Sequence, residues 1–134
     1  MADKIVMVVS EGSFDKALMP LIIGTTAASM GMEVHVFYTF FGLKLLKKGV
    51  RPKLKGLMRP FTGMIQSKMK KLKVPGFDEM MQQSKELGVN FYACSTSMAL
   101  LGVKESDLAD GVKVLGASAF VDIAAGSKAS FFIG

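Results

Sequence analysis

Short apolar segments of β-type composition alternate along the chain with segments of helical pattern, and this alternation constrains the fold more than any other feature. Strands that alternate with helices form βαβ units, in which the strands run parallel and the crossovers are right-handed. The pattern therefore predicts one α/β domain, with a central, mostly parallel sheet of about five strands and helices on both faces. The five expected strands are "KIVMVVS", "EVHVFYTF", "VNFYAC", "VKVLG" and "SFFIG".

The expected helices follow from apolar periodicity and from the glycines that end it. The first helix should run from about residue 14 to about residue 30. Ser13 is expected to cap it, and Pro20 to kink it or to mark a later start. We expect Ser95 or Thr96 near the N-cap of the helix that follows the third strand. The remaining helices are expected at 41–49, 63–73, 77–88, 95–102 and 117–129.

The basic residues are concentrated in an insert at about 44–75. The chain has 134 residues, enough for a single domain (1–134), and a net charge of +6. Eleven of its seventeen Lys and Arg residues lie between Lys44 and Lys73, a stretch without Asp or Glu. The rest of the chain is therefore net acidic, and the high isoelectric point belongs to the insert alone.

Four loops should meet where the parallel strands end. In open α/β sheets, ligands bind beyond the carboxyl ends of the strands. The loops expected there are 10–13, 39–42, 93–97 and 116–118. Ser10 and Ser13 belong to the first of them, so we expect both to line the pocket.

Cys94, the only cysteine, stands between an expected strand and an expected helix. A helix start stabilises a thiolate through free N–H groups and the helix dipole, and the hydroxyls of Ser95, Thr96 and Ser97 add hydrogen-bond donors. The alternative is that Cys94 is simply a small buried apolar residue, as free cysteines often are. Position alone does not separate a reactive thiol from a buried one.

Several other chemistries are disfavoured. A single cysteine rules out an intrachain disulfide or dithiol cycle, and His35 lies in mid-strand, where a structural role is favoured over a base for Cys94. We expect no metal site, because Asp107, Asp110 and Asp122 do not have the spacing of metal ligands. We expect no nucleotide cofactor, because "SEGS" lacks the glycine pattern of a phosphate loop. The apolar runs are too short for a signal peptide or a membrane span, and a lone thiol suits a reducing compartment, so a cytoplasmic protein is expected.

Three segments carry a family resemblance: "FDKA" at 14–17, "MGMEVHVFYTFFGL" at 30–43 and "ELGVNFYACSTSMALLGV" at 86–103. In this order they resemble the DsrE/DsrF-like family, in particular its branch with a Lys- and Met-rich insert. The resemblance implies a flavodoxin-like three-layer sandwich and homo- or hetero-oligomers. It also implies kinship with cytoplasmic sulfur carriers, whose persulfide-bearing cysteine follows a strand and opens a helix, the place that Cys94 holds here.

The leading prediction is therefore a sulfur carrier or sulfurtransferase. Cys94 would accept sulfane sulfur as a persulfide and pass it to another thiol, with Ser95, Thr96, Ser97, Ser10 and Ser13 binding the substrate. Expected partners are sulfur donor and acceptor proteins or small sulfur anions.

The alternative prediction places the function in the insert, as an oligomeric adaptor or a peripheral membrane protein. The segment 44–73 would then dock a partner protein or lie on an anionic membrane surface. It could instead be a solvated arm, or a positive lid over the strand ends near Cys94 that attracts anionic sulfur species. Nucleic acid is the least favoured partner, because only Phe61 is available there for stacking.

Overall fold

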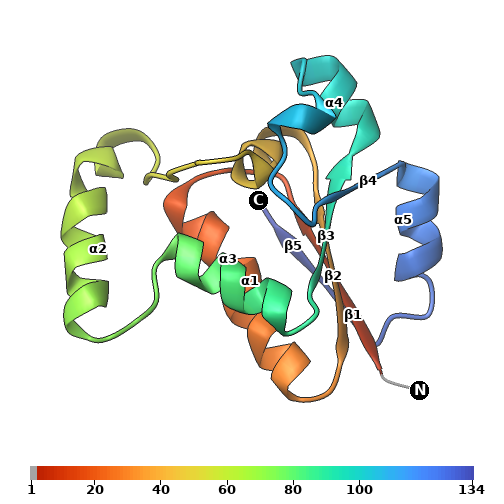
Figure 1. Cartoon of the computed structure of the whole chain (residues 1–134), viewed down its shortest axis with the longest axis horizontal. Helices are drawn as coiled ribbons and strands as arrows, with labels where there is room; N and C mark the ends of the chain where they lie inside the picture. The colour runs from red at the N-terminus through yellow and green to blue at the C-terminus, as the bar shows by residue number, and fades with distance from the viewer. Residues whose placement is uncertain (1–2) are drawn as a thin grey trace.

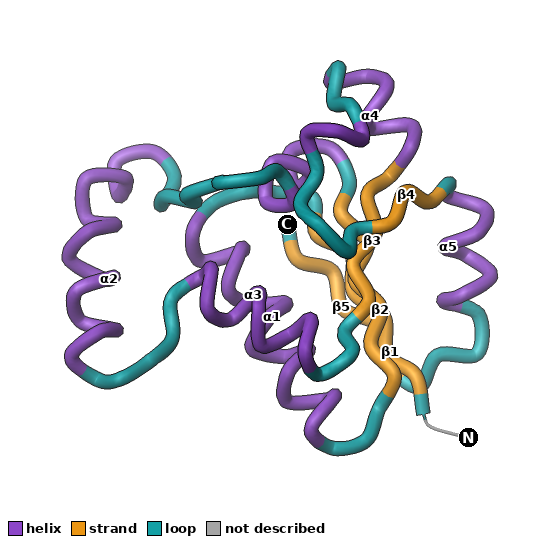
Figure 2. The backbone as a smooth tube through the Cα atoms, viewed as in Figure 1, coloured by secondary structure: helices purple, strands orange, loops and turns teal. Residues whose placement is uncertain are grey.

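The computed structural model describes residues 3–134 and consists of a five-stranded sheet between two helical layers (Figures 1 and 2). The three-layer α/β architecture predicted from the sequence is confirmed. The elements are β1 (Lys4–Val9), α1 (Phe14–Ser29), β2 (Glu33–Tyr38), the 3-10 helices η1 (Phe40–Leu46) and η2 (Gly56–Phe61), α2 (Thr62–Lys71), α3 (Phe77–Glu86), β3 (Asn90–Cys94), α4 (Ser95–Leu101), the 3-10 turn η3 (Glu105–Asp107), β4 (Lys113–Leu115), α5 (Ala117–Ala124) and β5 (Ala129–Ile133).

The sheet is parallel throughout, in the order β4-β3-β2-β1-β5. From β1 to β4 each crossover moves the chain one strand in the same direction, so right-handedness places α1 and α3 on one face. The last crossover returns across the whole sheet to β5, and its helix, α5, therefore lies on the opposite face (Figure 1). All five strands thus end at the same edge, where the candidate site lies.

The main core lies between the sheet and the layer of α1 and α3. Alternate strand residues such as Met7, Val36 and Phe91 point into it and are almost fully buried. Tyr38, also fully buried there, lies at an angle against Phe91. Burial raises the pKa of the Tyr38 hydroxyl far above its ordinary value, so it stays neutral.

The opposite face is covered less completely. A smaller cluster there joins Phe120 of α5 to Phe37, Tyr92 and Cys94 of the sheet, and the rings of Phe37 and Phe120 stack with centroids 4.4 Å apart. On the same side Phe132 of β5 is 83% exposed. An eight-residue helix is too short to cover five strands, so apolar sheet surface remains in contact with solvent.

The insert forms an arm that leaves the sheet after η1 and returns at α3. Figure 2 shows α2 standing apart from the sheet, beyond α1 and α3. Within α2 only Thr62 is buried; its hydroxyl accepts a hydrogen bond from Leu54 N–H and donates one to the Arg59 carbonyl. The arm is therefore tied down at its base, while most of its helix is exposed.

Three local expectations need revision. The α1 helix starts at Phe14 and simply contains Pro20, so a later start is wrong. Ser13 is the N-cap residue, but its hydroxyl makes no capping hydrogen bond. The segment after β2 is a 3-10 helix rather than an α-helix. It packs Gly42 so closely on the end of β1 that a Cβ there would lie 2.3 Å from the Val9 carbonyl oxygen.

Candidate functional site

Cys94 closes β3 and is itself the N-cap of α4, one residue earlier than predicted. Its extended backbone (φ −69°, ψ 118°) ends the strand and aims the first turn of α4 away from the sheet. Because β2 is the neighbouring strand, the residue after its end, Thr39, lies beside the start of α4. The two segments are 55 residues apart in sequence and are brought together only by the strand order.

Two hydroxyl groups connect these strand ends. The hydroxyls of Thr39 and Ser97 are hydrogen-bonded to each other, with their oxygens 2.8 Å apart. Ser97 Oγ also accepts a hydrogen bond from Phe40 N–H at 3.0 Å. Ser97 is 2% exposed, so its side chain is shielded from water. Phe40 has a left-handed backbone (φ 48°), an unfavourable conformation for a bulky residue that this hydrogen bond helps to hold.

The same groups act on the Cys94 thiol. Burial favours the neutral thiol, but it is outweighed by hydrogen bonds from the Ser97 side chain and backbone, the Thr39 hydroxyl and the Thr96 backbone. The net effect lowers the pKa of Cys94 below its ordinary value. The Cys94 thiolate therefore forms more readily than that of an ordinary cysteine, and among the described residues the causes of this shift are hydrogen bonds rather than a neighbouring cation or histidine.

Of the predicted serines, only Ser97 is a buried partner of Cys94. Ser95 and Thr96 are exposed on the first turn of α4, where Thr96 contributes its backbone. Thr39, whose side chain also lowers the pKa of Cys94, was not among the predicted site residues. The loop 39–42 was expected at the strand ends, so the signal was a hydroxyl residue directly after the β2 strand.

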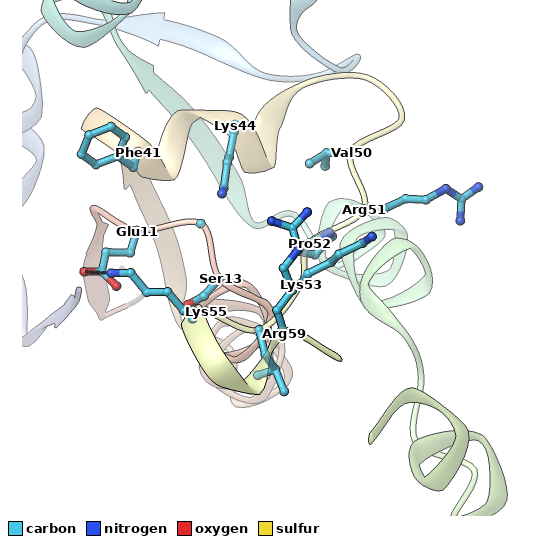
Figure 3. A pocket seen from close by; sticks show the side chains of 13 residues that line it. Glu11, Ser13, Phe41, Lys44, Val50, Arg51, Pro52, Lys53, Lys55 and Arg59 are labelled. Atoms are coloured by element: carbon cyan, nitrogen blue, oxygen red, sulfur yellow. Dashed lines mark hydrogen bonds and ion pairs between the residues drawn. The ribbon is translucent and has the colours of Figure 1, made fainter. Parts of the chain in front are cut away.

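Ser10 and Ser13 belong to a different part of the edge. Ser10 follows β1, two strands from β3, and its N–H bonds to the Ile133 carbonyl of β5. Ser13 lines a hollow of about 520 Å³ formed by loop 10–13 and the basic insert (Figure 3). Cys94 does not line this hollow, and it is only 5% exposed. The strand ends therefore hold two separate features: a covered thiol and a basic hollow.

His35 has a structural environment, in agreement with the sequence analysis. Its ring nitrogens lie 2.8 Å from Tyr92 Oη and 2.7 Å from Glu33 Oε2, and it is 8% exposed. In the sheet register it pairs with Asn90, at the opposite end of β3 from Cys94. A hydrogen bond from His35 lowers the pKa of Glu33. Since a residue at the far end of the strand cannot reach the thiol, His35 is not its base.

Within 3–134 no cluster of three or more His, Cys, Asp or Glu side chains is arranged to hold a metal ion. No helix in that range combines the length and the apolar character needed to cross a membrane.

Comparisons with known proteins agree with the resemblance seen in the sequence. The DsrE/DsrF/DrsH-like family matches residues 1–59 and 50–132. The sulfur carrier protein DsrE2 of Allochromatium vinosum is 31% identical over 97% of this chain and 98% of its own. The uncharacterized protein YrkE of Bacillus subtilis is 32% identical over 95% and 94%. The crystal structure of the ychN protein from E. coli shares the fold, with a TM-score of 0.66 at 14% identity, over 97% and 98% of the two chains.

Proposed function

Because this chain belongs to the DsrE/DsrF/DrsH-like family, we propose that it is a sulfur carrier in which Cys94 holds sulfane sulfur as a persulfide. A relative similar over nearly the whole length is named a sulfur carrier. The observation that supports the persulfide chemistry is the lowered pKa of Cys94 at this strand end, to which the side chains of Ser97 and Thr39 and the backbone of Ser97 and Thr96 contribute.

The transfer needs only one thiol. The Cys94 thiolate attacks the outer sulfur of a donor persulfide, forming a new S–S bond and breaking the donor's S–S bond, and the donor leaves as a thiolate. With thiosulfate as donor, sulfite leaves instead. An acceptor thiolate then attacks the outer sulfur of the Cys94 persulfide and restores the Cys94 thiolate. The two steps consume no oxidant, which suits a chain with a single cysteine.

Intact mass spectrometry tests this proposal. Protein incubated with polysulfide or thiosulfate should gain one or more sulfur atoms, and dithiothreitol should remove them. Cys94→Ser should gain none, while Ser95→Ala, which changes an exposed hydroxyl beside the site, should behave as wild type. A wild-type chain that stays unmodified with every donor refutes the carrier function.

The burial of Cys94 supports a second candidate, an adaptor that acts through the basic insert at an anionic membrane surface. The insert exposes large apolar side chains as well as the cations of α2, Lys68, Lys70 and Lys71. Such a surface suits the boundary between lipid headgroups and acyl chains. The exposed apolar residues are Leu57, Met58, Phe61, Met64, Ile65 and Leu72.

Vesicle co-sedimentation separates the two candidates. Binding to vesicles of mixed anionic and zwitterionic lipid should fall with rising salt and should be lost in the triple variant Lys68→Gln/Lys70→Gln/Lys71→Gln. Cys94→Ser should bind as wild type. Absence of binding to anionic vesicles, or binding that survives the triple variant, rules out the membrane function.

We further propose a cytoplasmic homo-oligomer. A lone thiol suits a reducing compartment, and the exposed Phe132 on the thinly covered sheet face is a surface that a second copy would bury. Light scattering coupled to gel filtration should give a mass above 14.4 kDa. Phe132→Asp should lower that mass, whereas a wild-type chain that elutes as a monomer refutes the assembly.

A further inference from the structure

A strongly cationic hollow opens at the carboxyl end of β1, between loop 10–13 and the basic insert. Its volume is about 520 Å³, within the range of small-molecule sites. Figure 3 shows Lys44 extending from η1 toward the opposite wall, and Glu11 meeting Lys55 at one side. Only one carboxylate, Glu11, lines the hollow. The cationic lining residues are Lys44, Arg51, Lys53, Lys55 and Arg59.

Most of this positive charge has no protein counter-ion. The Glu11 carboxylate accepts hydrogen bonds from Lys16 at 2.7 Å and from Lys55 at 3.1 Å. Both hydrogen bonds lower the pKa of this carboxyl, and the one from Lys16 has the larger effect. Across residues 3–134 no ion pair includes any of the other four cationic lining residues. Like charges gathered around one hollow raise its positive potential, so an anion bound there would relieve their mutual repulsion.

The start of α1 supplies hydrogen-bond donors to the same place. Ser13 lines the hollow and is 7% exposed, yet its hydroxyl makes no capping bond. Phe14 N–H is taken by the Lys53 carbonyl, and Ala17 N–H by the Ser13 carbonyl. The intervening amides of Asp15 and Lys16 have no carbonyl partner within the helix. The hydroxyl of this largely buried serine and a helix N-terminus facing a cationic wall form a setting that suits an oxyanion.

We infer that this hollow binds a phosphate-bearing small molecule, with its charged end at the start of α1 and its organic part against the apolar wall. The volume exceeds what a bare tetrahedral anion needs, and the lining includes apolar groups. Cys94 lies outside the hollow, so the inference does not depend on sulfur transfer. The sequence lacks a glycine-rich phosphate loop, and side chains of the insert would hold the anion instead. The apolar lining residues are Phe41, Val50, Pro52 and Leu54.

Lys44 can be displaced without a change of charge. Its side chain passes directly over Gly12, where a Cβ would collide with the Lys44 methylenes. Gly12→Ala therefore pushes the flexible lysine aside and leaves every charge in place. If Lys44 holds the anion, this variant should weaken binding several-fold.

Isothermal titration calorimetry on the full chain at constant ionic strength tests the inference, with pyrophosphate and ADP as probes. Both should bind saturably, ADP more tightly because its organic part meets the apolar wall. Lys44→Gln/Lys53→Gln should weaken pyrophosphate at least about tenfold, the effect of losing roughly one charge-assisted hydrogen bond. The matched control Lys68→Gln/Lys70→Gln removes the same charge from α2 and should bind as wild type.

The contrary results are equally specific. No saturable binding of pyrophosphate, or equal weakening in the two double variants, overturns the site. If thiosulfate binds more tightly than pyrophosphate, the claim that the ligand bears phosphate is wrong. If ADP binds no more tightly than pyrophosphate, the claim that an organic part packs against the apolar wall is wrong. Cys94→Ser should leave all affinities unchanged, so failure of this site and failure of the carrier function are distinguishable. Lys44 and Lys53 are exposed, so their double variant should fold; circular dichroism checks this.

Discussion

Removal of the Ser97 hydroxyl tests most directly whether hydrogen bonds lower the pKa of Cys94. In Ser97→Ala, Phe40 N–H loses its acceptor at 3.0 Å, Thr39 loses its partner at 2.8 Å, and the Cys94 sulfur loses a donor. The pKa of Cys94 should therefore rise, because the lost hydrogen bond favoured the thiolate while burial continues to favour the thiol.

The same substitution should also lower stability. An N–H left without an acceptor in a partly buried turn costs about 1–3 kcal/mol, and the left-handed Phe40 loses the bond that helps to hold it. The free energy of unfolding should fall by about 1–3 kcal/mol. For a domain of this size that corresponds to roughly 3–5 °C in Tm for each kcal/mol.

The assay is the pH dependence of iodoacetamide alkylation, followed by intact mass, together with thermal unfolding. The alkylation midpoint should move to higher pH in Ser97→Ala and stay in place in Ser95→Ala, because Ser95 is exposed and is not among the groups that lower the pKa of Cys94. Because the midpoint is compared rather than the rate, easier access to the thiol does not imitate the effect. An unchanged midpoint in a folded Ser97→Ala protein would show that the hydroxyl is purely structural.

Two further predictions concern packing and pH. Gly42→Ala should destabilise the chain by about 1–3 kcal/mol, because its Cβ would overlap the Val9 carbonyl, whereas Gly63→Ala, with open space around it, should be neutral or slightly stabilising in urea unfolding. The pKa of Glu33 is lowered by the hydrogen bond from His35, so its contribution to stability is present above the ordinary value of 4.5 and is lost as the pH falls through the folded value. The Tm of Glu33→Gln should therefore decrease less than that of wild type as the pH is lowered. An equal decrease in both proteins would contradict a stabilising role of the Glu33 carboxylate.

The class of fold and the position of the thiol could both be predicted from the sequence. Strand and helix patterns are local properties, since apolar side chains recur with the period of the element that buries them. The segment "VNFYACSTSM" therefore placed Cys94 at a strand end and helix start to within one residue. The clustering of cations in the insert was likewise visible without coordinates.

Which groups lie together at the strand ends depends on packing between segments distant in sequence. Thr39 reaches Cys94 only because β2 lies beside β3, while Ser13, expected in the same pocket, faces the basic hollow beyond β1. Hydrogen bonds between loops depend on strand order, and strand order results from packing between residues distant in sequence. The degree of burial of Cys94 has the same origin, since it depends on how η1 and α5 close over the strand end, and no local pattern records that.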